Sequence, residues 1–258
     1  MFNQWKEIYQ YREFLKNNVS KDLRTRYKGS FLGFLWTFLN PILMLIVYST
    51  LFSVIIKMDV KDYPIFLFCT LLSWNFFQTT LQSSSSIIVL SGNLIKKVYF
   101  PQEILPISIM AGGLINYLYG LLVLIPALII FGYYPDIHYI WLPIIIVIQS
   151  ILILACAFFI SALTVFFRDL EHMLSIFLTA LLYLTPVLYP ITMVPEEFRW
   201  LFSWNPMATI ITSYRDVFYY HRAPAWDSLL LIGICSLCLL FLTQYYFHRL
   251  KGKFIEEI

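Results

Sequence analysis

The chain is built around long apolar runs that contain no Asp, Glu, Lys or Arg. Six such runs have at least 20 residues: 31–56, 63–95, 104–135, 139–167, 173–195 and 228–247. Because a helix rises about 1.5 Å per residue, about 20 apolar residues cross the roughly 30 Å hydrocarbon core of a bilayer. The pattern therefore predicts an all-α, polytopic integral membrane protein forming one transmembrane domain over 1–258, with five transmembrane helices in 31–190 and a sixth in 228–258.

Residues 1–30 precede the first run and have the pattern of an amphipathic helix. Their apolar positions recur mostly every four or seven residues, with Lys and Arg between them: Ile8, Leu15, Val19, Leu23 and Tyr27. This spacing predicts a cytoplasmic helix that lies in the plane of the lipid headgroups. The alternative is a basic tail that only marks the cytoplasmic side of the membrane.

A seventh apolar stretch, 200–214, has only 15 residues and is interrupted by Asn205 and Pro206. It is too short to cross a bilayer, and the residue before a proline is disfavoured in a helix. We therefore expect a re-entrant helical hairpin on the outer side, within 191–227, and an ordinary structured loop is the alternative. The candidate gate residues of this hairpin are a carboxylate at a helix start, two tryptophans and the break itself: Glu196, Trp200, Trp204, Asn205 and Pro206.

The basic residues are distributed unevenly between the segments that connect the runs. With the N-terminus inside, 13 of the 18 Lys and Arg residues fall on the cytoplasmic side and five on the outer side. Cytoplasmic loops retain positive charge, so both termini are predicted to be cytoplasmic. Composition agrees with a membrane location, since 60% of the residues are hydrophobic and the mean hydropathy is +0.74. The net charge of +3 is small and gives no support for a nucleic-acid partner.

Several kinds of chemistry are absent from the sequence. It has no G-x-x-x-x-G-K-[S/T] phosphate loop, so we expect no cofactor on this chain, and ATP and Mg to be bound by a separate polypeptide. The six runs hold no charged residue, which argues against an ion-coupled transporter. No metal-type histidine spacing accompanies the outer carboxylates, so a membrane enzyme of glycan assembly is only an alternative. We therefore expect a transport subunit and not an enzyme.

Two groups of residues are candidates for binding. The second loop, 90–103, places aromatic residues beside lysines, which suits protein docking, although lysines alone also mark topology: Lys96, Lys97, Tyr99 and Phe100. Within the runs the polar residues are uncharged, among them Gln78 and Asn116, and such side chains join helices or line a hydrated path. Four aromatic residues of the first and fifth runs offer faces on which sugars stack, the alternative being lipid or core packing: Trp36, Tyr48, Tyr183 and Tyr189.

Three motifs resemble one family of membrane proteins. They are the run RYKGSFLGFLW from Arg26 to Trp36 with the following Asn40-Pro41, the Phe167-Arg168-Asp169 end of the fourth run, and Asn205-Pro206-Met207. In order and spacing these motifs are similar to those of the permeases of polysaccharide ABC exporters, which include O-antigen, capsule and teichoic acid exporters. The resemblance covers nearly the whole chain.

This resemblance implies a homodimer of six-span subunits in the bacterial inner membrane, in contact with membrane lipids and bound to two copies of a separate ABC ATPase. Such a complex moves a lipid-linked polysaccharide outward. By this likeness, residues 94–101 with Arg168 and Asp169 couple the chain to the ATPase, residues 196–220 gate the outer mouth, and aromatic residues of the first and fifth spans line the channel. O-antigen is the favoured cargo on similarity, with capsule and teichoic acid left open. A permease for a drug or a small lipid is the alternative.

Overall fold

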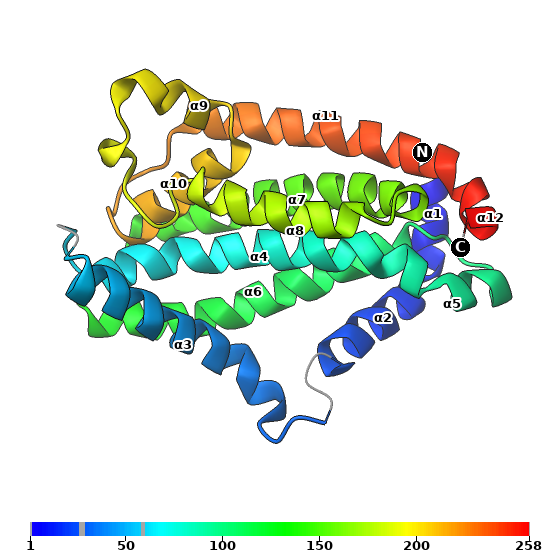
Figure 1. Ribbon diagram of the computed structural model, residues 1–258, viewed down its shortest axis with the longest axis horizontal. Helices are drawn as coiled ribbons and strands as arrows, with labels where there is room; N and C mark the ends of the chain where they lie inside the picture. Colours follow the sequence, from blue (N-terminus) through cyan, green and yellow to red (C-terminus); the bar gives the residue numbers. More distant parts are fainter. Residues whose placement is uncertain (1, 26–28, 58–59, 258) are drawn as a thin grey trace.

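The structure is a computed structural model that describes residues 2–25, 29–57 and 60–257, and regular secondary structure in those ranges is helical throughout (Figure 1). Its α-helices are α1 (Phe2–Gln10), α2 (Arg12–Thr25), α3 (Trp36–Ser49), α4 (Tyr63–Leu90), α5 (Gly92–Lys97), α6 (Ile104–Ile130), α7 (Leu142–Phe166), α8 (Leu170–Tyr183), α9 (Arg199–Ser203), α10 (Pro206–Phe218), α11 (Trp226–Leu250) and α12 (Phe254–Glu257). A π-helix, η2 (Thr50–Ile55), continues α3, and the 3-10 turns are η1 (Gly33–Leu35), η3 (Ile137–Trp141), η4 (Ile191–Met193), η5 (Glu196–Phe198) and η6 (Lys251–Lys253). The all-α class predicted from the sequence is confirmed.

Each of the six apolar runs contains a helix. Three helical stretches of the described residues are long and apolar enough to cross a membrane: Ile104–Ile130, Ile137–Phe166 and Trp226–Glu257. Trp36–Phe52 and Leu170–Tyr183 are shorter apolar helices of the first and fifth runs. The second run gives α4, which has 28 residues but carries many Ser, Thr, Asn and Gln side chains. This set of helices is that of a polytopic membrane protein.

Two of the apolar runs continue beyond the last residue of their long helix. The second run is divided at Ser91, where α4 ends and α5 begins. The fifth run extends to position 195, but α8 ends at Tyr183. Pro186 and Pro190 follow, and a proline lacks a backbone N–H and disfavours helix at the residue before it. The fifth run is therefore a helix followed by an irregular turn.

The long helices run side by side along the molecule, and both termini lie at the same end of it (Figure 1). That end carries α1, α5 and α12, and we name it the basic end after four lysines of α5 and η6: Lys96, Lys97, Lys251 and Lys253. The opposite end carries α9 and α10 and is named the hairpin end. The placement of both termini at one end agrees with the topology predicted from the charges.

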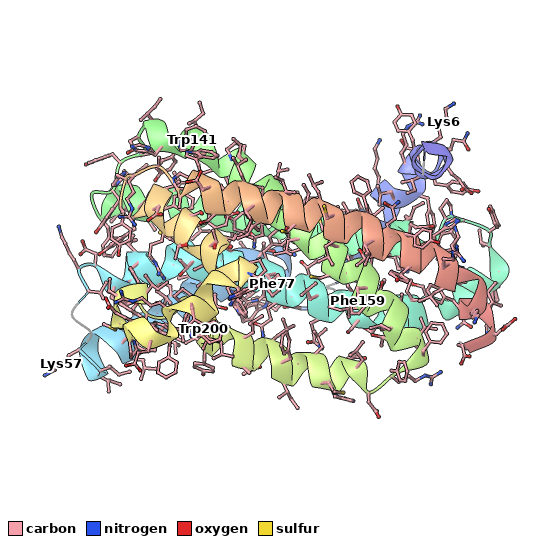
Figure 2. The ribbon with its side chains drawn as sticks, turned by 90° about the horizontal axis from the view of Figure 1, so that it is seen from above. Lys6, Lys57, Phe77, Trp141, Phe159 and Trp200 are labelled. Carbon is pink, nitrogen blue, oxygen red and sulfur yellow. The ribbon has the colours of Figure 1, made fainter. Side chains whose placement is uncertain are left out.

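Helix α4 lies in the middle of the bundle and packs against α3, α6, α7, α8 and α10. Phe66 and Trp74 are fully buried there, and Phe77 is 5% exposed. A central helix has neighbours on all sides, which explains why α4 has no single apolar face. In Figure 2, Phe77 lies in the middle of the molecule, and Lys6 and Lys57 project near opposite ends of it.

A polar network joins three helices inside this core. The side chain of Gln149 on α7 is fully buried; its Nε2 donates to the Ser73 carbonyl at 2.8 Å, and its Oε1 accepts from the Ser73 hydroxyl at 3.1 Å. The Tyr214 hydroxyl on α10 also donates to this oxygen, at 2.8 Å. Buried polar groups are costly unless they are hydrogen-bonded, so the network fixes how α4, α7 and α10 pack.

The N-terminal segment forms two helices that meet at Tyr11, and α2 packs against α6. Ile8 of α1 is buried. A Cβ atom at Gly112 of α6 would lie 2.7 Å from the Asp22 carboxylate of α2, so the glycine allows α2 to lie close to α6. Tyr27 of the predicted apolar face lies outside the described residues, as do Arg26 and Lys28 of the first motif. The position of α1 and α2 among the lipid headgroups stays a prediction.

Candidate functional site

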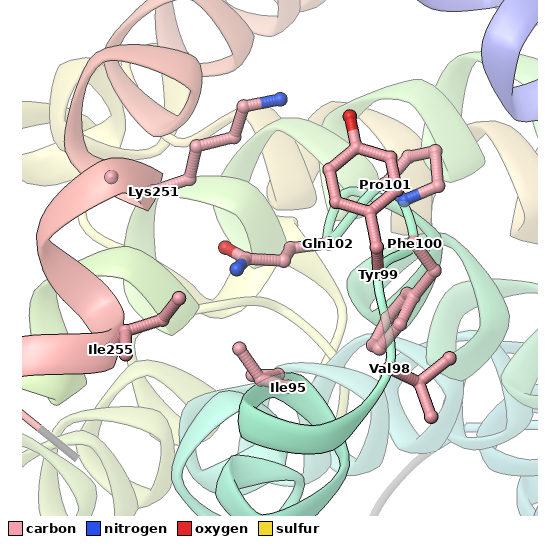
Figure 3. Close-up of a pocket in the computed structure, with 9 residues that line it drawn as sticks. Ile95, Val98, Tyr99, Phe100, Pro101, Gln102, Lys251 and Ile255 are labelled. Atoms are coloured by element: carbon pink, nitrogen blue, oxygen red, sulfur yellow. The ribbon is translucent and has the colours of Figure 1, made fainter.

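A pocket of about 210 Å³ opens at the basic end, between the segment that follows α5 and the turn η6 (Figure 3). Tyr99 on its wall is 80% exposed, and Val98 and Ile255 are 51% and 50% exposed. Exposed aromatic and aliphatic side chains around a concave surface are typical of a protein-docking site. The remaining wall is formed by Ile95, Phe100, Pro101, Gln102, Lys251 and Gly252.

Glu103, directly after Gln102, joins the two walls of this pocket. Its side chain is 3% exposed, its Oε1 accepts a hydrogen bond from Lys251 Nζ at 2.9 Å, and the same oxygen lies 3.1 Å from His248 Nδ1. Burial disfavours the charged carboxylate, but the hydrogen bonds from Lys251, the backbone and His248 outweigh burial and hold the pKa of Glu103 below its ordinary value. The ionised carboxylate therefore ties the segment before α6 to the end of α11.

The N-terminal helices border the same segment. The Tyr11 hydroxyl donates to the Tyr99 carbonyl at 3.4 Å, and the Tyr99 hydroxyl donates to Glu7 Oε1 at 3.1 Å. This bond to a carboxylate raises the pKa of Tyr99. The rings of Phe14 and Phe100 pack with their centroids 4.9 Å apart. Residues 98–101 are thus held between α1–α2 on one side and the C-terminal turn on the other.

The predicted coupling residues gather at the basic end but divide between two pockets. Lys96 and Lys97 are exposed on the last turn of α5, beside the pocket that contains Tyr99 and Phe100. Arg168 and Asp169 are exposed in the turn between α7 and α8 and line a separate pocket of about 490 Å³. Helix α12 contacts both α5 and α7 and so links the two regions. The coupling role of these residues stays a prediction.

The hairpin end has the helix, break and helix expected from the sequence. Glu196 begins the turn η5, which leads into α9, and it pairs with Arg199 at 3.1 Å. The Asn205 Oδ1 atom accepts from the Met207 N–H at 3.0 Å and so caps α10, whose first residue is Pro206. Asn205 and Pro206 also line a pocket of about 380 Å³ with Trp204, which is 83% exposed.

Arg215 of α10 is a residue whose position the sequence did not indicate, since it counted only as one of five outer basic residues. The structure buries it to 3% exposure. Its guanidinium donates to the Val187 carbonyl at 3.0 Å and lies 3.7 Å from the centre of the Phe66 ring. Such a cation–π contact is favourable in a buried place. The sequence offered one signal for this position: Arg215 follows Ile211 by four residues, so the two share a helix face, and Ile211 is buried.

The carbonyls of the turn after α8 are bonded by side chains of neighbouring helices. Thr70 of α4 donates to the Val187 carbonyl at 3.1 Å, and Tyr63 donates to the Leu188 carbonyl at 2.7 Å. Irregular backbone at membrane depth is tolerated only where protein satisfies its polar groups. Arg215, Thr70 and Tyr63 together satisfy the Val187 and Leu188 carbonyls of this turn.

The four predicted channel aromatics lie in two places. Trp36 and Tyr48 are partly buried on α3, where Trp36 Nε1 donates to the Ser30 hydroxyl at 2.9 Å. Tyr183 is 61% exposed at the end of α8, and its carbonyl accepts from the Tyr189 hydroxyl at 2.7 Å. Trp200 of the hairpin is 59% exposed. A channel formed by these rings stays a prediction.

Comparison with known proteins agrees with this arrangement. Residues 13–219 match the family model described as ABC-2 type transporter. The chain is 37% identical over 255 residues, 98% of each chain, to the O-antigen export system permease protein RfbA of Myxococcus xanthus. It is 32% identical over 240 residues, 92% of each chain, to RfbA of Klebsiella pneumoniae, and 23% identical over 202 residues, 76% of this chain and 77% of the relative, to the polysialic acid transport protein KpsM of Escherichia coli. The chain therefore belongs to the ABC-2 type transporter family.

Proposed function

We propose that this chain is the membrane-spanning permease subunit of an ATP-driven exporter that moves a lipid-linked polysaccharide, with O-antigen as the first candidate, from the cytoplasmic to the outer side of the inner membrane. The observation that carries this proposal is the similarity to an O-antigen export permease at 37% identity over 98% of both chains. The docking-type pocket at the basic end supports it, because a permease of this kind needs a surface for its ATPase.

In this proposal the basic end faces the cytoplasm and the hairpin end faces outward. Helix α3 with η2, and helices α4, α6, α7, α8 and α11, are the six spans. The 14 residues of α8 extend about 21 Å, so the turn that follows α8 completes the fifth span. The hairpin formed by α9 and α10 is re-entrant and gates the outer mouth, while aromatic residues of α3 and α8 line the path.

The motor is a separate ABC ATPase that binds ATP and Mg. Two copies of it dock on a homodimer of this chain, at the pocket between Tyr99 and Ile255 and at the neighbouring turn of Arg168 and Asp169. The exposed lysines of α5 favour an acidic partner surface, because opposite charges on two surfaces guide their association.

The proposal is tested by deleting the gene and restoring it. Deletion should remove the polysaccharide from the cell surface, and the restored, tagged chain should copurify with an ABC ATPase in mild detergent. Reconstitution then examines the motor: vesicles that hold both subunits should move lipid-linked glycan with ATP and not with a proton or sodium gradient. Transport of small amphiphilic drugs, without transport of glycan, would contradict the proposal.

A further inference from the structure

A groove of about 370 Å³ lies between α3, α4 and α6, separate from the pocket at the basic end. It is located at mid-length of the long helices. Asn75, on its wall, is the thirteenth of the 28 residues of α4, and Asn116 is the thirteenth of the 27 residues of α6. At a rise of about 1.5 Å per residue, each is about 18 Å from the start of its helix. The groove therefore lies near the middle of the membrane in the proposed topology.

The wall of the groove carries neutral hydrogen-bonding groups from three helices. Asn40 comes from α3, Asn75 from α4 and Asn116 from α6, and Thr37 and Thr79 add hydroxyl groups. None of the described residues that line it is charged. Its volume is within the range of about 300–1000 Å³ that is usual for small-molecule sites.

Three residues that line this groove have a buried polar side-chain atom with no hydrogen-bond partner among the described residues. The atoms are the hydroxyl oxygens of Thr37 and Tyr117, residues that are 6% and 3% exposed, and the side-chain oxygen of Asn116. Buried polar atoms nearly always have a partner in native proteins, and each exception calls for an explanation. Because Thr37 and Asn116 belong to different helices and line one groove, a ligand that supplies hydroxyl groups there explains the unpaired atoms of both residues.

The groove also has an aromatic wall. Phe76 and Tyr117 are each 3% exposed, and their rings stack with centroids 5.4 Å apart and an angle of 17° between their planes. Amides and hydroxyls beside an apolar wall suit a ring that has hydroxyl groups at its edge and C–H groups on its face. Phosphate and diphosphate need cationic partners, which this wall does not offer.

We propose that this groove binds a neutral sugar unit of the exported glycan during its passage. The assignment rests on the proposed function and adds to it the three asparagines as the residues that contact the cargo. In this assignment the groove accepts the sugar part of the cargo and does not accept the phosphate groups of its lipid carrier.

The first test measures export in cells that carry Asn75→Leu together with Asn116→Leu. Leucine keeps a similar volume and is tolerated by the bilayer, so the chain should insert. Loss of two hydrogen bonds should lower the exported glycan by about tenfold. The abundance of the chain and its copurification with the ATPase should be unchanged. Two single variants on the first span form a matched pair. Thr37→Val removes a hydroxyl group from the groove and should reduce export. Thr50→Val removes an exposed hydroxyl group that donates to the Ile46 carbonyl and should leave export unchanged.

The second test keeps the asparagines and measures binding. Thr79→Cys places a thiol at the exposed rim of the groove, in a chain whose exposed Cys235 and Cys238 are replaced by Ser. In the complete complex, polysaccharide isolated from the surface of the same cells should slow labelling of this thiol by a methanethiosulfonate reagent. Inorganic pyrophosphate and phosphatidylethanolamine vesicles should not slow it. Adding Asn116→Leu should remove the protection.

The outcomes separate this assignment from the proposed function. If the wild-type complex exports glycan and the double leucine variant exports it equally well, the groove is not a sugar site, although the permease function stands. Protection by pyrophosphate or by the phospholipid alone assigns the groove to a headgroup and overturns the proposal. A disulfide between two copies of an Asn40→Cys variant would show that the partner subunit fills the groove, and it would also overturn the proposal. If the wild-type complex exports no glycan, the proposed function itself fails.

Discussion

Lys251→Met removes the principal cation that pairs with the buried Glu103 carboxylate, and we expect it to destabilise the basic end. The Glu103 side chain is 3% exposed, and its Oε2 atom has no hydrogen-bond partner among the described residues. Without Lys251 the carboxylate keeps His248, whose side chain is 44% exposed. The substitution therefore leaves a buried negative charge with one partly exposed partner.

The magnitude follows from how far the pair is buried. Removing one partner of a fully buried ion pair costs about 3–5 kcal/mol, and a single hydrogen bond to a charged group contributes about 1.5–3 kcal/mol. Lys251 is 26% exposed, so solvent screens part of the interaction. We expect a loss of about 2 kcal/mol, which for a chain of this length lowers the melting temperature by about 4–8 °C.

The assay is the tryptophan fluorescence of the purified complex during heating in detergent. Lys253→Met, at an exposed position of the same turn, is the matched control and should change stability by less than about 0.5 kcal/mol. Glu103→Gln should cost less than Lys251→Met, because a neutral amide can still accept a bond from the lysine and no buried charge is left unpaired. Equal melting temperatures for the Lys251 and Lys253 variants would refute the reasoning.

The stabilisation should also depend on pH, with a sign set by the pKa of Glu103. Because the folded pKa lies below the ordinary value of 4.5, the contribution is fully present above that value and is lost as the pH falls through the folded pKa. The stability difference between wild type and Glu103→Gln should therefore be larger at about pH 7 than in acid, and below the ordinary pKa it should decrease progressively as the pH falls. A difference that grows in acid would contradict the assignment.

Three further predictions concern coupling, the hairpin and the buried arginine. Replacing Lys96 and Lys97 together by Glu should separate ATP hydrolysis from export without affecting membrane insertion; unchanged glycan export would remove the docking role of α5. If the break positions α9 and α10, Pro206→Ala should reduce glycan export more than it reduces the amount of the chain on immunoblots. An equal fall in glycan export and in the amount of the chain would assign Pro206 a purely structural role. Arg215→Leu should destabilise the chain by about 1–3 kcal/mol because turn carbonyls lose a donor, whereas Arg215→Lys should retain part of that stability in the same melting assay.

The sequence was sufficient to predict the helical class and most helix positions, because a long charge-free apolar run is compatible with few structures other than a membrane-spanning helix. The start of α4 at Tyr63 and the start of α6 at Ile104 coincide with the predicted starts. The Asn205-Pro206 break also falls where predicted, since a cap residue followed by proline is a local signal. These features are set by residues that are neighbours along the chain.

The parts that the sequence did not reveal depend on contacts between distant residues. Glu103 meets Lys251 across 148 positions, and Arg215 meets Val187 only because α10 turns back beside the end of α8. The groove is a similar case, because Asn40, Asn75 and Asn116 come from three separate helices. From the sequence, Asn116 was expected to join helices or to line a hydrated path, Asn40 belonged to the first motif, and Asn75 was not singled out. Nothing in their spacing along the chain placed the three on one wall.

Helix α4 connects the three regions on which the proposed transport depends. Its first residue, Tyr63, donates a hydrogen bond to the turn after α8, and Asn75 in its middle lines the groove. At its C-terminal end, a single residue, Ser91, separates α4 from α5. The junction at Ser91 keeps its backbone hydrogen bonds, since the Ser91 N–H donates to the Ile87 carbonyl at 3.1 Å and the Ser91 carbonyl accepts from the Leu94 N–H at 2.9 Å. A hinge would need unbonded backbone to absorb a change of angle. A displacement of α5 by the ATPase is therefore expected to move α4, and with it the wall of the groove and the turn that holds the hairpin end.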